Sequence, residues 1–399
     1  MISSALSRRI RIHVQGKKHR FRAVCHLGFE KITAEEFKSI GIEEPFLIKD
    51  GSVVFESKWN DSWRVLAFSR TCTKLLMEIH SFSAENFGRF EKEIRNTPWS
   101  LFLPSNITPE IQVTCVRSRL YHSEALKERA LPLISEALKN TEENNQLSST
   151  QKILLSFEDN ICTISLDLGG EPLYKRGFDR FVEKAPLKET MAASILWAAD
   201  FFSTKHLIDP MAGSGTFSLE GVMWALSKNP ASCRSFAFQE QPGFKKTSWD
   251  YLIQKENPLS TESLHKQDSI SKQNSISKEL PSFSIGDYEL KAIETILHNI
   301  KTSQIPPDIL KPIQQDFFQI PSTKEKSLIV LNPPYGKRIA ADTLNLYREI
   351  GKKIRNDFNH SNWAIICPSH EAQKALNLEH THIIHSNHGG LNISILIKK

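Results

Sequence analysis

The chain has 399 residues, of which 40% are hydrophobic and 24% are charged. This apolar share excludes a disordered chain, and the length predicts two or three domains, because single hydrophobic cores rarely grow past about 250–300 residues. No stretch offers the roughly 18 uncharged apolar residues of a membrane-spanning helix, so we expect no membrane partner. The net charge of +6 permits a nucleic-acid partner without requiring one.

Basic residues dominate the start of the chain, and no acidic residue occurs before Glu30. We predict that residues 1–20 form a basic tail. A solvated tail, a tail that contacts phosphate and an organellar transit peptide are the three alternatives. The cations that would contact phosphate are Arg8, Arg9, Arg11, Lys17, Lys18 and Arg20.

Residues 21–165 mix short strand patterns with helical patterns, which predicts an α+β region of one or two small sandwich domains. The strand patterns occupy 21–29, 51–57 and 107–118. The helical patterns occupy 32–41, 61–79 and 122–140. We expect Gly41 to end the first of these helices.

Glycine, proline and charged residues in 166–186 are typical of a link between domains. From there on, helical and strand patterns alternate, beginning with an amphipathic helical pattern at 187–202. Repeated βα units predict a doubly wound, mostly parallel sheet with helices on both faces across 187–399. Within this region, 251–280 is rich in Ser, Lys, Gln and Asn, so we expect a surface insertion that is at least partly disordered.

The six cysteines are scattered along the chain. The sequence contains neither a C-x-x-C pair nor a histidine cluster at zinc spacing. We therefore expect reduced thiols, no metal site and a cytoplasmic location.

The segment DPMAGSGT, residues 209–216, lies between an apolar strand pattern and a helical pattern. Gly213 and Gly215 let the backbone approach a ligand closely, and the helix N-terminus offers free N–H groups. The segment is not the full dinucleotide fingerprint, because Ser218 stands where the third glycine would be. It is not a P-loop either, because no Gly-Lys-Ser/Thr follows. A tight structural turn is the alternative to a ligand-binding loop.

Two acidic residues occupy places where ligands bind in such folds. Asp287 ends the next strand pattern and can accept both hydroxyls of a ribose; a helix N-cap is the alternative. Asp316 precedes the apolar strand at 328–331 and can accept from an adenine amino group; an ordinary loop residue is the alternative. Together with the glycine loop, this order of groups fits S-adenosylmethionine (SAM) as the cofactor.

The apolar run 328–331 ends at Asn332-Pro333-Pro334-Tyr335. An exocyclic amino group on a nucleobase is a poor nucleophile, because its lone pair is delocalised into the ring. The Asn332 side-chain carbonyl and the Pro333 backbone carbonyl can each accept one of its N–H groups. The prolines make the turn rigid, and Tyr335 can stack on the base. The pattern predicts methyl transfer to a base amino group; a plain proline turn is the alternative.

The chain resembles the THUMP-domain RNA methyltransferases of the bacterial 23S rRNA guanine-N2 type. Six segments from residue 173 onward carry this resemblance: LYKRGF, APLKETMAASIL, DPMAGSGTFSLEG, NPPYGKRI, LYREIGKKI and the closing HSNHGGLNISILIK. The segment SRTCTKLLMEI and the strand-helix pattern around it resemble the ferredoxin-like and THUMP part of the family.

This resemblance implies a Rossmann-like class I methyltransferase domain whose seven-stranded, mostly parallel sheet has an antiparallel seventh strand. It implies a smaller α+β ferredoxin-like and THUMP region before it, RNA as partner and a SAM cofactor. The implied SAM-binding residues are Asp209, Pro210, Ala212, Gly213, Ser214, Gly215, Thr216, Asp287 and Asp316. The implied catalytic residues are Asn332, Pro333, Pro334 and Tyr335.

The chain departs from the family at the insertion 251–280 and at Glu289, where an aspartate is common. Long members carry a second methyltransferase domain that this chain lacks, so we expect a single activity. The leading hypothesis is guanine-N2 methylation of 23S rRNA. Alternatives are guanine-N2 methylation of tRNA, adenine-N6 methylation of RNA or DNA, and a non-catalytic RNA-binding assembly factor.

Overall fold

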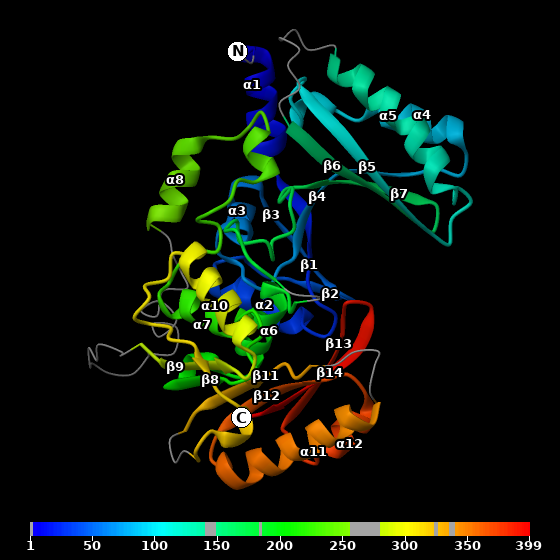
Figure 1. Ribbon diagram of the computed structural model, residues 1–399. Helices are drawn as coiled ribbons and strands as arrows, with labels where there is room; N and C mark the ends of the chain where they lie inside the picture. The colour runs from blue at the N-terminus through cyan, green and yellow to red at the C-terminus, as the bar shows by residue number, and fades with distance from the viewer. Residues whose placement is uncertain (1–2, 140–148, 183–185, 256–279, 323–325, 335–339) are drawn as a thin grey trace.

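The computed structural model describes residues 3–139, 149–182, 186–255, 280–322, 326–334 and 340–399. Two seven-stranded sheets organise the chain, one built before residue 168 and the other after residue 205. In Figure 1 the first sheet and its helices, coloured blue to green, lie above the second sheet, whose last strands are red. Among the described residues, no helix is both long and apolar enough to cross a membrane.

The first sheet has the strand order β2-β3-β1-β4-β7-β6-β5. Neighbouring strands run antiparallel, except that β5 and β6 are parallel. The strands are β1 (Lys18–Val24), β2 (Leu47–Lys49), β3 (Ser52–Lys58), β4 (Lys74–Ser83), β5 (Ile107–Val116), β6 (Ser149–Glu158) and β7 (Ile161–Asp167). The helices are α1 (Ser4–Ile10), a π-helix (Arg11–Gln15), α2 (Glu30–Ser39), α3 (Trp59–Phe68), α4 (Phe87–Asn96), a 3-10 turn (Trp99–Leu101) and α5 (Ser123–Lys139).

The second sheet has the order β10-β9-β8-β11-β12-β14-β13. Strand β14 runs in the opposite direction to all the other strands. The strands are β8 (His206–Asp209), β9 (Ser282–Asp287), β10 (Ile313–Gln314), β11 (Leu328–Leu331), β12 (Asn362–Cys367), β13 (His382–His388) and β14 (Leu391–Lys398). The helices are α6 (Glu189–Ala198), α7 (Thr216–Ala225), α8 (Lys246–Lys255), α10 (Leu290–Thr302), α11 (Ala340–Asp357) and α12 (His370–Leu376), with 3-10 turns at Phe201–Ser203, Ala237–Glu240 and Phe317–Gln319. This confirms the predicted Rossmann-like fold preceded by a smaller α+β region.

Strand β11 occupies the centre of the second sheet, between β8 and β12. Leu328 and Val330 lie in the hydrophobic core on one face, whereas Ile329 and Leu331 lie in the core on the other. A central parallel strand is covered on both faces and therefore needs apolar side chains on both. This is why the sequence shows an unbroken apolar run here instead of an alternation.

Helix α2 ends as the sequence predicts. Gly41 adopts a left-handed conformation, with φ of +82°. The Ile42 N–H donates to the Phe37 carbonyl at 2.9 Å, and the Gly41 N–H donates to the Lys38 carbonyl at 3.0 Å. These are the bonds by which a glycine after a helix satisfies the last carbonyls.

The helical pattern predicted over 61–79 is wrong in its second half. Helix α3 ends at Phe68, and β4 begins at Lys74. The three residues Leu75, Leu76 and Met77 are buried, because β4 lies in the middle of the first sheet between β1 and β7. A short, consecutive apolar run of this kind cannot be distinguished from a helix by periodicity alone.

The segment predicted to be a basic tail is folded. It consists of α1 and the π-helix, and it leads directly into β1. Ile10 and Val14 are buried in the core of the first part. The Gln15 side chain donates a hydrogen bond of 2.9 Å to the Gly243 carbonyl. Two apolar residues four positions apart anchor one face of the helix, while the cations stay exposed on the others.

The amphipathic helix predicted at 187–202 is instead the nearly fully buried helix α6. It contacts α7 of the second part and α2 of the first part. The His26 ring lies 2.9 Å from the Thr190 hydroxyl, and Phe29 belongs to the same core as α6. The first part therefore covers the face of α6 that would otherwise meet water, and the helix is apolar or uncharged almost all round.

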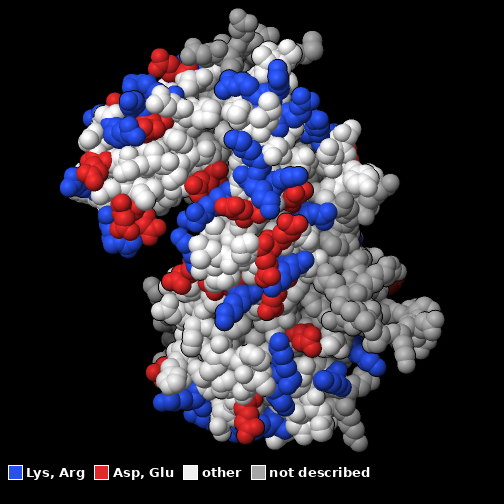
Figure 2. Space-filling view, turned by 180° about the vertical axis from the view of Figure 1, so that it is seen from behind, with Lys and Arg blue, Asp and Glu red and all other residues white. Residues whose placement is uncertain are grey.

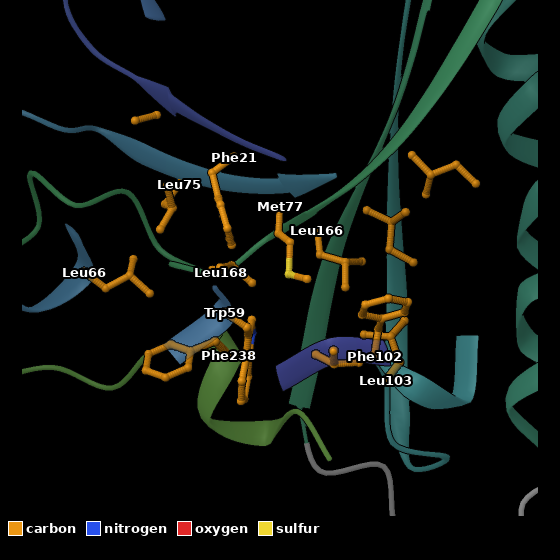
Figure 3. Close-up of a cluster of buried hydrophobic side chains, with 14 of the residues drawn as sticks. Phe21, Trp59, Leu66, Leu75, Met77, Phe102, Leu103, Leu166, Leu168 and Phe238 are labelled. Atoms are coloured by element: carbon orange, nitrogen blue, oxygen red, sulfur yellow. The ribbon is translucent and has the colours of Figure 1, made fainter. Parts of the chain in front are cut away.

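After α7 the chain returns to the first part, so residues 231–252 contribute to the first core although the sequence places them inside 187–399. The rings of Phe238 and Trp63 lie 5.2 Å apart. The Trp59 indole N–H donates to the Gln241 side chain at 3.1 Å. Figure 3 shows Phe238 beside Trp59 among the buried side chains of the first part. The first core is therefore built from two distant stretches of the chain.

A buried ion-pair network joins the two parts. The Glu220 carboxylate, on α7, is fully buried and accepts hydrogen bonds from Arg176 at 2.9 Å and from Arg70 at 3.3 Å. The Arg176 guanidinium also donates to the Arg70 carbonyl at 2.9 Å. The Arg70 backbone N–H donates to Glu36 at 2.7 Å. Since Arg176 lies in 166–186, the predicted link between domains is anchored at a buried charge.

Glu220→Ala is expected to lower the free energy of unfolding by about 3–5 kcal/mol, because it leaves Arg70 and Arg176 buried without their counter-charge. Chemical denaturation followed by tryptophan fluorescence measures this change. The matched control is Glu171→Ala, which removes an exposed ion pair with Lys175 and should cost less than about 1 kcal/mol. Equal, small losses in both variants would contradict the structural role of Glu220.

Candidate active site

The candidate site lies at the carboxyl ends of the central strands of the second sheet. From β8 the chain moves to β9 on one side, and it later enters β11 on the other side of β8. The loops that follow β8 and β11 therefore diverge, and open α/β sheets bind ligands at such switch points. A cavity of about 480 Å³ occupies this place, within the size range of small-molecule sites.

The loop 209–216 forms one wall of the cavity. Gly213 and Gly215 both have positive φ, +55° and +78°. A Cβ at Gly215 would lie 3.3 to 3.4 Å from Ile285 and Ile296, whereas a Cβ at Gly213 would meet nothing within 4 Å. Gly215 thus permits close packing under the loop, and Gly213 leaves the backbone of the cavity wall open to a ligand.

Arg180 holds this loop in place. Its guanidinium donates to the Ser214 hydroxyl at 2.8 Å and to the Thr216 hydroxyl, and it pairs with Glu189 on α6. The Arg180 and Glu189 side chains are only 8% and 11% exposed. The sequence does not single out Arg180 as a site residue, because Arg180 lies in the predicted link and outside the glycine loop and the Asn-Pro-Pro-Tyr motif.

Asn299 supports the same loop from α10. Its side-chain amide donates to the Ser214 carbonyl at 3.0 Å and to the Phe181 carbonyl at 2.9 Å, and its oxygen accepts from the Phe181 N–H at 2.8 Å. Asn299 is fully buried. The sequence did carry a signal for it, because it stands on the apolar face of α10 with Ile296 and Ile300, where an amide needs buried partners.

Asp287 is the last residue of β9 and lines the cavity. Its Oδ2 accepts from the Gly213 N–H at 2.9 Å, and its Oδ1 accepts from the Glu289 N–H at 3.1 Å. The N-cap of α10 is Glu289, so the alternative of Asp287 as an N-cap is wrong. An ionised carboxylate has about four acceptor positions, so both oxygens retain capacity for ligand hydroxyls.

Asp316 faces the same cavity from the loop after β10. Its side chain accepts from the Phe318 N–H at 3.0 Å and so caps the following 3-10 turn. Phe317 and Phe318 of this turn also line the cavity. This wall therefore combines a fixed carboxylate with aromatic surface, which suits a planar, hydrogen-bonding ligand.

Asn332 follows β11 directly and lines the cavity. Its Oδ1 is buried and accepts no hydrogen bond within the described part of the chain. Buried polar atoms are nearly always partnered, so this oxygen is a candidate acceptor for a ligand donor. Pro334 is exposed at the cavity, whereas Pro333 is buried. The predicted Tyr335 lies outside the described residues.

The structure brings most of the predicted site residues around one cavity. Those that line it are Pro210, Ala212, Gly213, Ser214, Thr216, Asp287, Asp316, Asn332 and Pro334. Those that do not are Asp209, Gly215 and Pro333. Within the described ranges, no group of three or more His, Cys, Asp or Glu is arranged to hold a metal ion.

Asp209 lies beneath the cavity wall and is 1% exposed. Its Oδ2 accepts from the Ser218 N–H at 3.2 Å and from the Ser218 hydroxyl at 2.9 Å, while Oδ1 has no partner among the described residues. Burial raises the pKa of this carboxyl to about 7, although the bonds from Ser218 act in the opposite direction. Through these bonds Asp209 holds the first turn of α7, where the loop 209–216 ends.

With this geometry in view, comparison with known proteins identifies the family. The model of the RMKL-like methyltransferase domain matches residues 176–394, more than half of the chain. The chain belongs to this methyltransferase family. A second model, the RlmL ferredoxin-like domain, matches residues 20–76 and confirms the ferredoxin-like part of the first region.

Individual relatives are more distant. A "Ribosomal RNA large subunit methyltransferase K/L" of Syntrophotalea carbinolica is 25% identical over 391 residues, which are 94% of this chain and 53% of that protein. "Putative RNA methyltransferase slr0064" of Synechocystis is 26% identical, over 92% of this chain and 94% of that protein. The chain thus spans about half the length of the K/L relatives that it matches.

A solved structure shares the fold over nearly the whole chain. SMU.472, "a putative methyltransferase complexed with SAH", superposes with a TM-score of 0.81 at 20% identity, covering 96% of this chain and 98% of that one. This likeness confirms the fold.

Asp209→Asn is expected to remove a pH dependence of stability. The pKa of this carboxyl is about 7 in the folded protein, against an ordinary value of 3.8. The contribution of this group to the free energy of unfolding is therefore complete below about pH 4, and it falls as the pH rises to about 7. The free energy of unfolding of the variant should therefore rise relative to wild type across this window. Urea unfolding at several pH values measures it. A difference between the two proteins that stays constant with pH would contradict the raised pKa.

Proposed function

We propose that this protein is a SAM-dependent RNA methyltransferase that transfers a methyl group to the exocyclic N2 of a guanine in 23S rRNA. The observation that carries the proposal is the buried, unpartnered Oδ1 of Asn332 at the edge of a cavity that Asp287 and Asp316 also line. Membership in a methyltransferase family supports the reaction class. The names of the relatives support RNA, and large-subunit ribosomal RNA in particular, as the substrate.

The residues around the cavity fit SAM. Asp287, with acceptor capacity left on both oxygens, would hold the ribose hydroxyls. Asp316 would accept from the adenine amino group, beside the aromatic surface of Phe317. The open backbone at Gly213 would receive the amino-acid portion. SAM, when bound, supplies an electrophilic methyl group.

The chain prepares the acceptor nitrogen for attack. Asn332 Oδ1 and the Pro333 carbonyl would each accept one N–H of the base amino group. Two acceptors favour a pyramidal nitrogen, which frees its lone pair, and they stabilise the positive charge that develops there. Because Pro333 and Pro334 restrict the backbone, both acceptors are held in place before the base arrives. Tyr335 is proposed to stack on the base.

We propose that residues 21–165, as a ferredoxin-like and THUMP region, bind RNA, that residues 187–399 transfer the methyl group, and that residues 166–186 join the two. Figure 2 shows Lys and Arg side chains gathered over the upper part of the molecule, and a hollow beneath the lobe at its upper left. The basic residues at the start of the chain are exposed and available to phosphate: Arg8, Arg9, Arg11, Lys17, Lys18 and Arg20.

We also propose a cytoplasmic location. All six cysteines are free thiols in the structure, and four of them are buried. Proteins of reducing compartments keep their cysteines in this state.

The test is a methyl-transfer assay with isotopically labelled SAM. Unmodified rRNA, tRNA and DNA are offered separately, each is digested, and the labelled nucleoside is identified by mass spectrometry. Labelled N2-methylguanosine in rRNA is the expected result. The same nucleoside in tRNA would change the substrate, and N6-methyladenine would change the base. Binding of RNA without any labelled product on free RNA or on assembling ribosomal subunits would overturn the proposal in favour of a non-catalytic assembly factor.

Asn332→Ala is expected to lower kcat by a factor of about 100 or more, as the loss of one oriented polar group in an active site does. The dissociation constant of SAM should stay nearly unchanged, because the amide acts on the acceptor base. Single-turnover kinetics and calorimetry measure the two quantities. Asn96→Ala, at an exposed position on α4, serves as the control. Near wild-type turnover in Asn332→Ala would contradict the role of Asn332.

Asp287→Ala is expected to weaken SAM binding by about 10- to 100-fold, the usual worth of hydrogen bonds to a charged group. The variant loses the ribose acceptors and also the bonds that fix Gly213 and Glu289. Calorimetric titration with SAM measures the change. Asp308→Ala, at an exposed position, is the matched control. Unaltered affinity would show that Asp287 serves the loop and not the ligand.

A further inference from the structure

A second cavity, of about 400 Å³, lies at the carboxyl end of β12, on the β12 side of β11. The first cavity lies on the β8 side of β11. The first cavity is lined from the loops after β8, β9, β10 and β11. The second is lined from the loop after β12 and from the β13–β14 hairpin. Since β11 and β12 are parallel neighbours, the residues that follow them leave the same edge of the sheet side by side.

Both parts of the molecule build this second cavity. Leu27, from the loop between β1 and α2, lines it together with His385 of β13. The backbones meet closely here, because a Cβ at Gly28 would lie 2.3 Å from the His385 carbonyl. In Figure 1 the red β13–β14 hairpin lies below the lobe of β5, β6 and β7, on the side where Figure 2 shows the hollow. Leu27 is the contribution of the first part to the lining, and the other lining residues belong to the second part.

One of the residues that line the cavity has an orphaned polar group. Ser386 is 4% exposed, and its hydroxyl has no hydrogen-bond partner among the described residues. The neighbouring His385 ring is exposed and bonds the Ser394 hydroxyl at 3.1 Å through Nδ1, so it has a defined orientation. His370, which is also exposed and lines the cavity, adds a second imidazole. A buried hydroxyl without a partner is a group to which a ligand can bond.

The chemistry of the lining selects the ligand. Among the described residues that line the cavity there is no Asp, Glu, Lys or Arg. Without Lys or Arg, the lining lacks the charge-assisted bonds that favour phosphate, so a base is the better fit. Imidazole rings and Leu27 offer flat or apolar surface for stacking, and the hydroxyls of serine and the amide of Asn392 offer bonds to a base edge. This combination is how proteins recognise an unstacked nucleobase.

We propose that this cavity binds the base of the nucleotide that flanks the target guanine in the RNA, while the target amino group lies at Asn332. The inference rests on the proposed function. Asn332 follows β11, and the second cavity is lined from β12, β14 and β13, which stand one, two and three places from β11 in the sheet. At about 5 Å per strand, this separates the two bases by about 5–15 Å. This exceeds the roughly 3.4 Å rise of stacked nucleotides. The flanking base is therefore splayed away from the target base, which opens the target to the methyl donor.

The test compares RNA binding by full-length variants, using fluorescence anisotropy with a fluorescein-labelled, unstructured single-stranded RNA of mixed sequence. The double variant His370→Ala/His385→Ala should bind this RNA about 10-fold more weakly, since stacking of one base is lost. Ser386→Ala should bind it about 2- to 10-fold more weakly. His382→Ala, on the same strand but outside the cavity lining, should bind as wild type does.

Two further readouts separate base recognition from other effects. The salt dependence of binding should keep its slope in the histidine variant, because no phosphate contact is lost. The dissociation constant of SAM should be unchanged. Affinity equal to wild type in both cavity variants, or a reduced salt slope, would overturn the inference. If wild type binds the RNA but transfers no methyl group to any substrate, the proposed function fails, while the comparison of variants still decides whether the cavity holds a base.

Discussion

The buried carboxylate of Glu220 is the constraint on which the arrangement of the two parts depends. It lies on α7, the helix that begins at the end of the glycine loop, and it is neutralised by two arginines that come from elsewhere. Arg70 belongs to the first part and Arg176 to the link. A buried carboxylate without these partners would be costly, so docking of the first part stabilises the helix that carries the site. The part proposed to bind RNA and the part that carries the candidate site are thereby held in one geometry.

The loop that forms the cofactor cavity is held by side chains from three directions. Asp287 bonds its backbone from β9, Asn299 bonds it from α10, and Arg180 bonds its hydroxyls from the link. All of these contacts are made within the chain itself. The loop is therefore organised before binding, and little ordering remains to be done when a ligand arrives. The same contacts explain why a segment of the link belongs functionally to the site.

Asn332 stands between two cavities of different chemistry. The cavity on the β8 side presents the carboxylates of Asp287 and Asp316 with aromatic surface. The one on the β12 side presents imidazoles and hydroxyls, with no Asp, Glu, Lys or Arg among its described lining residues. In the proposed reaction, the methyl donor and the RNA strand approach the same amide from opposite sides. Because Leu27 of the first part completes the second cavity, the part proposed to grip RNA also shapes the place where its bases enter.

The sequence by itself determined the class of fold and the main catalytic candidates, because these depend on short-range patterns. The unbroken apolar run forms the strand β11, and the glycine loop and Asn332 follow the ends of β8 and β11, as the sequence predicts. Only the tertiary structure decided which side chains meet. The strand β4 was hidden in a helical pattern, the burial of α6 depended on the first part, and Arg180 and Glu220 acquire their roles from partners more than 30 residues away. Local patterns record a segment's own preference, whereas contacts between distant segments depend on how the whole chain packs.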